Sequence, residues 1–405
     1  MTPSSAATAI AHPQVSAKKS RQASRIQLYD RHTIHDLHWP DTEAGSYAMR
    51  YLLPLMTQSP DAYIANAHTE LYALVLDDLV IPVTVNEDEY DNSYVCSPYT
   101  HYVSYAKEEL NVLNNRILRN TLSGLLSCTG LLLKASKINK TVHFNNWLLS
   151  TNLYANLTPE QTTAVLHFLK KRFPAHAIVF RSLNAATTGI MLETLRNESC
   201  RLVPSRQIYL LRPHDPASMN AKSRWLIKRD YSLLRKHGYE VSGPAAMKES
   251  DIPRILELYN ALYLHKYSFY NPQFQESYIR LALQEGTLML YGLRKNGRLD
   301  AVLGFFSREG VMTTPLFGYD TSLPQQLGLY RMLSAVLLQI AAERGHLLHE
   351  SSGAAQFKRN RGAVVDIEYS AIYDKHLPVL RRSGWILLSM LLEGVGVPII
   401  RRFKL

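Results

Sequence analysis

The sequence predicts an α/β (α+β) fold in which helices flank a mixed central sheet. Two observations lead to this class. Strand-like and helix-like segments alternate through the first half, which is the pattern of an α/β layer. The second half begins with two helical segments, continues with three short strands joined by tight turns, and then returns to alternating helix and strand.

Length and composition predict two domains with ordinary hydrophobic cores. The chain has 405 residues, of which 46% are hydrophobic, and a single domain commonly spans about 100 to 200 residues. No apolar run approaches the roughly 18 residues that cross a membrane. The three cysteines are far apart, so neither a disulfide framework nor a zinc site is expected. A reducing cytoplasm is the predicted location.

Composition along the chain divides it into four segments. Residues 1–26 are basic, lack acidic residues and have no continuous apolar run, which predicts a disordered tail rather than a signal peptide. An N-terminal α/β domain is expected over 27–212 and a second domain over 213–380. The prolines of Arg212–Pro216 favour a turn-rich link between them. Residues 381–405 are expected to form a helical tail.

Apolar periodicity predicts the elements of the first half. A strand pair around the turn at Asp77 and Asp78 comes first, and a tyrosine-rich segment and a long helix follow. Strands and helices then alternate. The predicted elements are strands over 69–76 and 79–86, a helix over 106–134, a strand over 141–149, a helix over 159–172, a strand over 177–183, a helix over 189–196 and a strand over 202–211.

Capping and turn signals predict the elements of the second half. Asp251 and Pro253 mark a helix start, and Asn271-Pro272 repeats the signal for a second helix that ends at Gly286. Asn296-Gly297 between apolar runs is a hairpin signal. After these two helices, the predicted elements are strands over 287–293, 299–307 and 311–319, a helix over about 327–344, and strands over 347–350 and near 366–373.

The segment from Phe317 to Tyr330 combines a strand end, a proline-containing loop and the opening of an apolar helix. The first N–H groups of a helix have no intrahelical acceptor, and the positive end of its dipole attracts anions. Gly328 would let a ligand approach the backbone closely. The sequence therefore predicts a phosphate site here. Its predicted residues are Gln325, Gln326, Leu327, Gly328, Leu329 and Tyr330.

The same residues carry a family resemblance. Gln325 to Tyr330 resembles the Gln/Arg-x-x-Gly-x-Gly/Ala turn with which Gcn5-related N-acyltransferases (GNAT) bind the pyrophosphate of coenzyme A. Residues 222 to about 376 resemble the acyltransferase domain of proteins related to cellulose biosynthesis and of the FemAB superfamily. The segments that carry this likeness are the basic opening helix from Lys222, Gly318-Tyr319-Asp320, Glu350 to Gly353, and Phe357-Lys358 leading to Gly362.

The resemblance implies tandem acyl-CoA N-acyltransferase-like domains, of which the first is degenerate. It also implies acyl-CoA as a co-substrate, with no permanently bound cofactor. Tyr330 departs from the family turn, which usually has a small residue there. That departure leaves open the donor of FemAB-like transferases, aminoacyl-tRNA.

An acyltransferase of this kind positions the donor carbonyl and needs a base for the nucleophile and an acid for the leaving group. Glu350, at a predicted strand end, is the first candidate for the base and Asp320 is the second. Tyr373 and Tyr369 are candidate acids, as tyrosine often is in the family. Lys358 is expected to neutralise a donor phosphate or the developing oxyanion, as the equivalent lysine of the family is thought to do.

Each candidate also has a structural interpretation. Glu350 could simply pair with Arg359 or Arg361, and the tyrosines could belong to the core. No metal site is predicted.

The net charge of +11 predicts an anionic partner. A cluster of cations surrounds the single Asp230 on one predicted helix, and it is either a solvated face or a landing surface for phosphates. Those phosphates would belong to coenzyme A, an acyl carrier protein or tRNA. The cations are Lys222, Arg224, Lys228, Arg229, Arg235 and Lys236.

Four other segments have both a functional and a structural interpretation. Tyr94 to Tyr102 brings together the thiol, hydroxyl and imidazole groups used in nucleophilic catalysis, without an identifiable orienting carboxylate. His143 to Asn152 either lines a cleft or forms a satisfied turn. His265 to Pro272 either closes over an acceptor or simply links two helices. The helix at Trp385 to Leu392 is either buried against the domain or lies on a membrane surface.

Motifs of serine hydrolases, zinc proteases, P-loop enzymes and dinucleotide-binding domains are absent from the sequence. Our hypothesis is an N-acyltransferase that transfers an acyl group from acyl-CoA to an amine of a small metabolite or surface-polymer precursor. The alternatives are a FemAB-like aminoacyl-tRNA-dependent transferase and a non-catalytic basic scaffold that binds RNA or an acyl carrier protein. The acceptor, the acyl chain and the oligomeric state are not predicted.

Overall fold

The computed structural model describes residues 24–110 and 115–396 and confirms the predicted α/β class. Its strands are β1 (Ile26–Tyr29), β2 (Glu70–Leu76), β3 (Leu79–Asn86), β4 (Thr141–Phe144), β5 (Ala177–Leu183), β6 (Arg201–Leu211), β7 (Glu240–Ser242), β8 (Met289–Lys295), β9 (Arg298–Arg308), β10 (Val311–Tyr319), β11 (Leu347–His349) and β12 (Val364–Tyr373). Its helices are α1 (Glu43–Gln58), α2 (Tyr105–Glu109), α3 (Arg116–Ala135), α4 (Pro159–Arg172), α5 (Ala185–Asn197), α6 (Ala221–His237), α7 (Ile252–Asn260), α8 (Glu276–Glu285), α9 (Leu329–Glu343), α10 (Ala355–Asn360) and α11 (Val379–Leu391).

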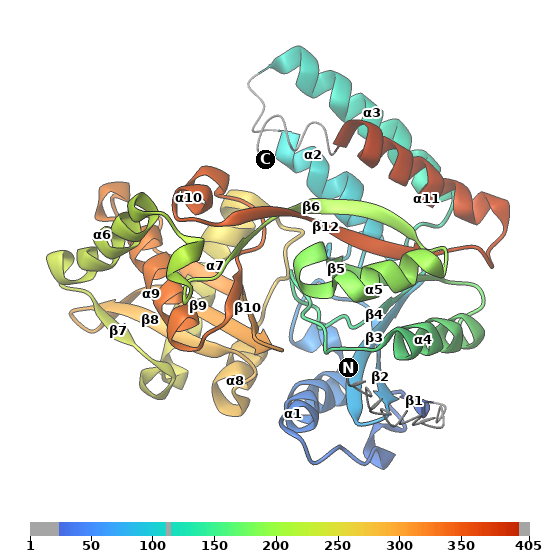
Figure 1. Ribbon diagram of the computed structural model, residues 1–405, viewed down its shortest axis with the longest axis horizontal. Helices are drawn as coiled ribbons and strands as arrows, with labels where there is room; N and C mark the ends of the chain where they lie inside the picture. Colours follow the sequence, from blue (N-terminus) through green and yellow to red (C-terminus); the bar gives the residue numbers. More distant parts are fainter. Residues whose placement is uncertain (1–23, 111–114, 397–405) are drawn as a thin grey trace, which may run out of the picture.

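The described strands form one mixed sheet in the order β1-β2-β3-β4-β5-β12-β6-β11-β10-β9-β8-β7. The pairs β4–β5 and β10–β11 are parallel, and the other pairs of neighbouring strands are antiparallel. Figure 1 shows two groups of strands and helices joined by the long β6 and β12 strands. The predicted mixed sheet flanked by helices is therefore confirmed.

The two halves repeat one order of elements. In the first half β2, β3 and β4 lead to α4, β5, α5 and β6, with α2 and α3 inserted between β3 and β4. In the second half β8, β9 and β10 lead to α9, β11, α10 and β12. The parallel pair of each half is short: Thr141–Phe144 pairs with Ala177–Phe180, and Val311–Thr313 with Leu347–His349. The repeat supports the tandem arrangement that the family resemblance implied.

The halves exchange their last strands. β12 of the second half pairs with β5 of the first, and β6 of the first half pairs with β11 of the second. β6 and β12 also pair with each other over most of their length. The predicted boundary near residue 212 remains a prediction, because the exchanged strands make one continuous sheet of the two halves.

The largest hydrophobic cluster also joins the halves. Tyr51 and Trp147 of the first half lie against Phe306 and Tyr278 of the second, with ring centroids 6.2 Å apart for Trp147–Phe306 and 6.5 Å for Tyr51–Tyr278. Burying rings of this size contributes about 1.5–3 kcal/mol each. The two halves therefore hold a fixed relation to each other through apolar packing as well as through strand pairing.

Most predicted elements lie within a few residues of the observed ones, with two corrections. The strand predicted over 141–149 ends at Phe144, because Asn145 and Leu148 have positive φ values of 56° and 57° and turn the chain. The helix predicted over 106–134 consists of two helices, α2 and α3, and residues 111–114 between them lie outside the described part. The predicted basic tail over 1–26 falls almost entirely outside it as well.

The C-terminal helix α11 packs against the first half of the chain, and not against the second half from which it emerges. Trp385 is 2% exposed and shares a cluster with Tyr102 and Leu133. Burial, the favoured interpretation of this helix, is thus correct for the Trp385 face. Among the described helices, none is long and apolar enough to cross a membrane.

Candidate active site

The predicted anion turn lies at the start of α9. Gln325–Leu327 form a short 3-10 turn, and Gly328 then adopts a left-handed conformation with φ of 78° immediately before the helix. No side chain caps α9 at this residue. The N–H groups of Leu329, Tyr330 and Arg331 therefore have no acceptor within the helix, and they lie at the positive end of its dipole. This geometry fits a phosphate group.

The side chains of this turn have different surroundings. Gln325 and Gln326 are exposed, whereas Leu329 is 5% exposed and belongs to the core. Leu327 is half-buried against the same core. An anion at this helix start would therefore meet mainly backbone N–H groups, and the leucines hold the helix in place.

Tyr330, the residue that departs from the family turn, is half-buried in an aromatic cluster. Its ring centroid lies 4.7 Å from that of Phe357, 5.6 Å from that of Phe317 and 6.1 Å from that of Tyr319. Burial and the charge of Glu350 raise the pKa of Tyr330, so its hydroxyl stays protonated at neutral pH. Tyr330 therefore lies in the first turn of α9 and close enough to Glu350 to be affected by its charge.

Glu350 lies where the parallel strands β10 and β11 stop pairing. The ladder between them covers only Val311–Thr313 and Leu347–His349, and β10 has a register shift beyond Thr313. The backbone N–H of Glu350 then donates to the carbonyl of Tyr209 on β6, which fixes its position. The short ladder therefore places a carboxylate at the point where the two strands diverge.

Glu350 is half-buried, and one oxygen of its carboxylate is buried without a hydrogen bond. Its Oε2 atom has no partner among the described residues, and no ion pair within 4.0 Å joins it to Arg359 or Arg361 in that part of the chain. Burial raises the pKa of Glu350 to about 7, although the positive charges of Lys358 and Arg361 act in the opposite direction. A carboxyl group that titrates near neutrality and is not engaged elsewhere is suited to general base catalysis.

Lys358 on α10 lies beside Glu350 and binds its backbone. It is 7% exposed, and its Nζ donates to the backbone carbonyls of Glu350 at 2.5 Å and Ser352 at 2.8 Å. Burial lowers the pKa of Lys358, and Glu350 partly restores it. An ammonium group has three donors, so two carbonyls hold Lys358 in place and one N–H remains for a ligand. The structure therefore brings Glu350, Lys358 and Tyr330 together, as an acyl-transfer site requires.

Asp320, the second candidate base, has a structural environment instead. It is 7% exposed, receives 2.6 Å hydrogen bonds from Arg254 and Arg298, and accepts from the backbone and hydroxyl of Ser322. These donors hold the pKa of Asp320 below its usual value despite burial. A carboxylate whose oxygens are occupied in this way is a poor proton acceptor. We therefore leave Asp320 out of the proposed catalytic group.

Tyr373, the first candidate acid, lies far from Glu350. The residue of β12 opposite Tyr209 is Val365, and Tyr373 lies eight residues further along the strand, opposite Ile178 of β5. At roughly 3.3 Å per residue this separation is about 26 Å. Its ring stacks on His376 with a centroid distance of 5.5 Å.

Tyr369, the other candidate acid, lies at the register shift of β12, about 13 Å from Val365 by the same measure. Neither tyrosine can protonate a leaving group at Glu350.

Asp230, the single acid of the basic helix α6, is a buried junction. It is fully buried and binds Arg331 of α9 at 2.6 Å and Arg361 after α10, and Arg229 lies 3.7 Å away. The carboxylate therefore ties the helix that starts at the anion turn to the segment that carries Lys358. This ion cluster holds the two parts of the site together.

Replacing Asp230 with alanine is expected to lower the free energy of unfolding by about 3–5 kcal/mol, because two arginines lose their buried counter-charge. Chemical denaturation would measure this loss. The control is Glu240→Ala, which removes the same charge from an exposed side chain. It should change the free energy of unfolding by less than about 0.5 kcal/mol. Equal effects of the two substitutions would show that the Asp230 cluster contributes no stability.

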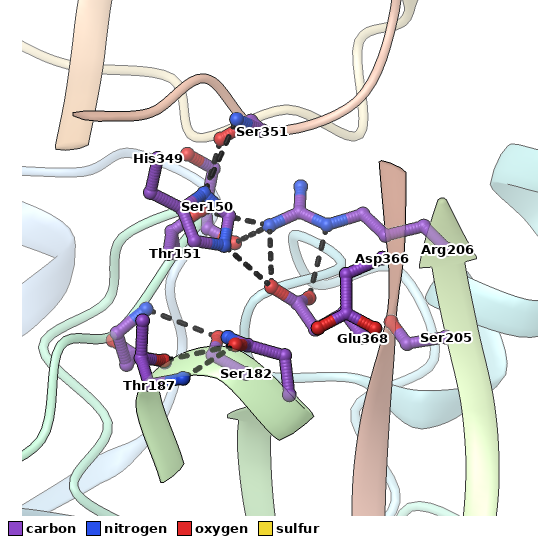
Figure 2. Close-up of polar contacts among 12 residues, drawn as sticks. Ser150, Thr151, Ser182, Thr187, Ser205, Arg206, His349, Ser351, Asp366 and Glu368 are labelled. Atoms are coloured by element: carbon purple, nitrogen blue, oxygen red, sulfur yellow. Dashed lines mark hydrogen bonds and ion pairs between the residues drawn. The ribbon is translucent and has the colours of Figure 1, made fainter. Parts of the chain in front are cut away.

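A second polar cluster lies between the halves. Figure 2 shows Arg206 of β6 and Glu368 of β12 facing Thr151, with His349 and Ser351 beside them. Arg206 donates to Glu368 at 2.9 Å and to Thr151 Oγ1 at 2.8 Å, and Thr151 Oγ1 lies 2.9 Å from Ser351 Oγ. This chain of contacts fixes the backbone immediately after Glu350.

A cavity of about 40 Å³ adjoins this cluster. Thr151 and Asn152 contribute to its wall, so the segment predicted to line a cleft or form a turn does reach a cavity. His349 and Arg308 line it from the second half. Burial lowers the pKa of His349 to about 4, so its imidazole is neutral at neutral pH. A cavity of this size holds only a few water molecules.

The segment Tyr94 to Tyr102, which contains the residue types of nucleophilic catalysis, is not arranged for catalysis. Cys96 is fully buried, and burial raises the pKa of its thiol to about 12. His101 binds the hydroxyl of Ser205 at 2.9 Å, and burial lowers its pKa. A protonated thiol in an apolar environment is inert, so this segment has a structural role.

The first half has no open anion turn at the position equivalent to α9. The N-terminus of α4 is closed by a capping box in which Thr158 and Gln161 bind each other's backbone, and Pro159 supplies no N–H. Glu160 adds a negative charge to the first turn. The uncapped start of α9 therefore has no counterpart in α4.

Sequence reasoning missed Arg206, Glu368 and His349, and it included Thr151 only as part of the segment His143 to Asn152. They come from four separate segments, and only the exchange of β6 and β12 brings them together. A charged residue within an apolar strand, such as Arg206 in β6 or Glu368 in β12, was the signal that could have identified them. In the described part of the chain, no group of three His, Cys, Asp or Glu side chains is placed to hold a metal ion.

Residues 221–359 match the family model for the acetyltransferase (GNAT) domain. No curated protein matches the chain. Solved structures similar to it include L-PGS from Bacillus licheniformis, with 15% identity over 57% of this chain and 77% of that chain and a TM-score of 0.43. FemX has 10% identity over 54% of this chain and 78% of that chain, with a TM-score of 0.41.

A GCN5-related N-acetyltransferase from Kribbella flavida is also similar, with 13% identity over 57% of this chain and 81% of that chain and a TM-score of 0.31. These TM-scores are low, so the assignment rests on the family model, which covers the anion turn, Glu350 and Lys358. The chain is therefore an acyltransferase whose residues 221–359 form a domain of the GNAT family, as the sequence predicted.

Proposed function

We propose that this protein transfers an acyl group from acyl-CoA to an amine of a small metabolite or surface-polymer precursor. The observation that carries the proposal is Glu350, whose Oε2 atom is buried without a hydrogen bond, beside Lys358 and close to the uncapped start of α9. A base, a cation and a phosphate-binding turn are the parts that transfer from a phosphate-bearing donor to an amine requires.

In the proposed reaction the amine nitrogen attacks the thioester carbonyl carbon. A C–N bond forms, the C–S bond breaks, and the proton of the amine passes to Glu350. The free N–H of Lys358 is available to the carbonyl oxygen as negative charge develops on it, or to a donor phosphate. The departing thiol has a pKa of about 8.5. It therefore needs little help from an acid, which agrees with the absence of Tyr373 and Tyr369 from the Glu350 environment.

The segment between α7 and α8 supports an acceptor or acyl chain with an apolar part. Tyr263 and Tyr267 belong to the π-helix Ala261–Tyr267, and both affect the pKa of Tyr330, which places them beside the site. Tyr267 is 53% exposed, so part of its ring is available for contact. The backbone of the neighbouring Tyr270 binds Tyr94 of the first half. This segment therefore lies between the two halves, at the edge of the proposed site.

For the first half we propose that it remains a degenerate acyltransferase copy that binds no donor. The capping box at α4 supports this, because it occupies the N–H groups that a phosphate would need.

For the compartment we propose the cytoplasm. Cys128 is exposed as a free thiol, which a reducing environment preserves.

A second candidate is an aminoacyl-tRNA donor, and the cations of α6 favour it. α6 packs against α9, and most of its cations are exposed beside the donor turn. A tRNA would meet many phosphates, whereas coenzyme A offers only a few. The number of phosphates is measurable, because each phosphate contact contributes about one unit to the dependence of log affinity on log salt concentration.

Neutralising Lys222, Lys228, Arg235 and Lys236 to glutamine is expected to change acetyl-CoA affinity only modestly and to leave its shallow salt dependence unaltered. These four are exposed, and Arg229 is spared because it lies near the buried Asp230. Calorimetric titration at several salt concentrations measures both quantities. The same variant and the wild type are titrated with charged tRNA.

The control variant removes four exposed cations from other elements, namely Lys137, Lys171, Arg196 and Lys375. It should behave as the wild type in every titration. A wild-type affinity for charged tRNA tighter than about 1 μM at physiological salt, with a steep salt slope that flattens only in the α6 variant, would reject acyl-CoA as the donor. It would establish the aminoacyl-tRNA alternative.

A further inference from the structure

The helix α3 presents an apolar stripe to solvent. Ile117 is 80% exposed, Leu131 71%, Leu132 57% and Leu125 46%. Large aliphatic side chains are rarely this exposed along one element, and a contiguous set of them marks a surface that meets something apolar. The stripe is not a consequence of a poorly packed helix, because Thr129, Gly130 and Leu133 on the opposite face are buried.

The positions of the exposed residues follow one face of the helix. With 3.6 residues per turn, the seven positions of the stripe fall within about 120° of arc. None of them is charged. The stripe consists of Ile117, Thr121, Gly124, Leu125, Cys128, Leu131 and Leu132.

The neighbouring helix α11 also has exposed apolar side chains. Val379, Leu380 and Met390 of α11 are 75%, 65% and 67% exposed, whereas Trp385 packs inward with Leu133 of α3. Gly384 allows the close approach, because a Cβ atom there would lie 3.0 Å from Cβ of Ser136 and in contact with Leu133. Figure 1 shows α3 and α11 side by side at the edge of the molecule, apart from the helices of the second half.

The charges on these two helices have one sign. Residues 116–135 and 379–391 contain Arg116, Arg119, Lys134, Arg381 and Arg382 and no Asp or Glu. Arg116 and Lys134 lie at the two ends of α3, on the same side of the apolar stripe. Arg381 donates to the backbone carbonyls of Ser136, Ala175 and Lys140, so Arg116 and Lys134 are the exposed cations beside the stripe. An apolar face with cations beside it, on helices without acids, matches the interface of an anionic lipid bilayer, where acyl chains lie beneath negative headgroups.

We infer that α3 and α11 dock this protein on the surface of an anionic phospholipid membrane, with the apolar stripe buried at the level of the headgroups and both helices parallel to the surface. A second copy of the chain is a poorer occupant of the stripe. In a twofold dimer with antiparallel α3 helices, the cation-bearing sides of the two copies would meet. The inference does not depend on the identity of the acyl donor or acceptor.

The test uses the full chain and flotation with vesicles of phosphatidylcholine alone or mixed with phosphatidylglycerol. Wild-type protein should float with the anionic vesicles and much less with the neutral ones. The triple variant Ile117→Gln, Leu131→Gln, Leu132→Gln should bind the anionic vesicles at least about tenfold more weakly, because three aliphatic side chains no longer enter the interface. The substitutions are at exposed positions, so folding should be unaffected.

A matched control replaces exposed aliphatic residues elsewhere, Ile190 on α5 (68% exposed) and Val364 on β12 (66% exposed), with glutamine. It should float as the wild type does. A second measurement uses Cys128, the exposed one of the three cysteines, which lies on the stripe. An environment-sensitive fluorophore attached to Cys128 should shift its emission to shorter wavelength with anionic vesicles, and not with neutral ones.

Two results would overturn the inference. One is wild-type protein that fails to float with anionic vesicles, or that floats equally well after the triple substitution. The other is a wild-type dimer in solution that the triple substitution converts to a monomer, because a second copy would then be the occupant of the stripe.

Discussion

Replacing Glu350 with glutamine is expected to lower kcat by roughly 100- to 10,000-fold, the usual contribution of a positioned general base. The substitution preserves the shape of the side chain and removes its ability to take a proton. Glu350 makes no hydrogen bond through Oε2 among the described residues, so no network is broken. Donor affinity should therefore remain close to that of the wild type, and the loss should appear in turnover.

The pH dependence of the reaction provides an independent check. A base acts when it is deprotonated, so kcat/KM of the wild type should rise with pH through the raised pKa of Glu350, at about 7. In the Glu350→Gln variant this inflection should disappear. A variant with full turnover per folded molecule and a lower melting temperature would mean that Glu350 has a structural role only.

Replacing Gly328 with aspartate is expected to weaken coenzyme A binding by roughly 100-fold or more. The side chain would bring a negative charge to the start of α9, where the pyrophosphate is expected, and two like charges about 4 Å apart repel by about 4 kcal/mol in a partly solvated site. Calorimetric titration of the folded variant measures the loss.

The control for this substitution is Gly328→Asn. Gly328 has φ of 78°, a conformation that Asn and Asp tolerate better than other residues, and a Cβ atom there would lie 3.1 Å from Cδ1 of Leu233. Both variants therefore carry the same backbone and steric cost, and they differ only in charge. Equal losses of affinity in the two would mean that the helix start holds no phosphate. Unchanged affinity in Gly328→Asp would reject the site altogether.

The position of Glu350, the first base candidate, was predictable from sequence because its local surroundings define it. Glu350 follows a short apolar strand and precedes a small, glycine-containing segment, and in the structure it lies at the end of β11 with its backbone held by Tyr209. The anion turn was predictable for the same reason. A proline-containing loop, a glycine and an apolar helix are a local pattern, and α9 begins at Leu329.

The other candidates failed where the outcome depended on distant partners. Asp320 lies at the end of β10 as predicted, but arginines from α7 and β9 occupy its oxygens. Tyr373 lies in the predicted strand, but the register of β12 against β5 and β6 carries it about 26 Å from the site. Neither the ion pairs nor the register is visible in a local pattern of residues.

The sequence by itself determined most elements of this protein and the class of its fold, and it predicted an anion site at the start of α9, because periodicity, capping and turn chemistry act over a few residues. Only the tertiary structure decided which of these elements share a site. β12 lies between β5 and β6 because the halves exchange their last strands, and that exchange brings Arg206, Thr151 and Glu368 together. The titration of Glu350 was decided in the same way, since burial raises its pKa and burial results from the packing of the whole chain.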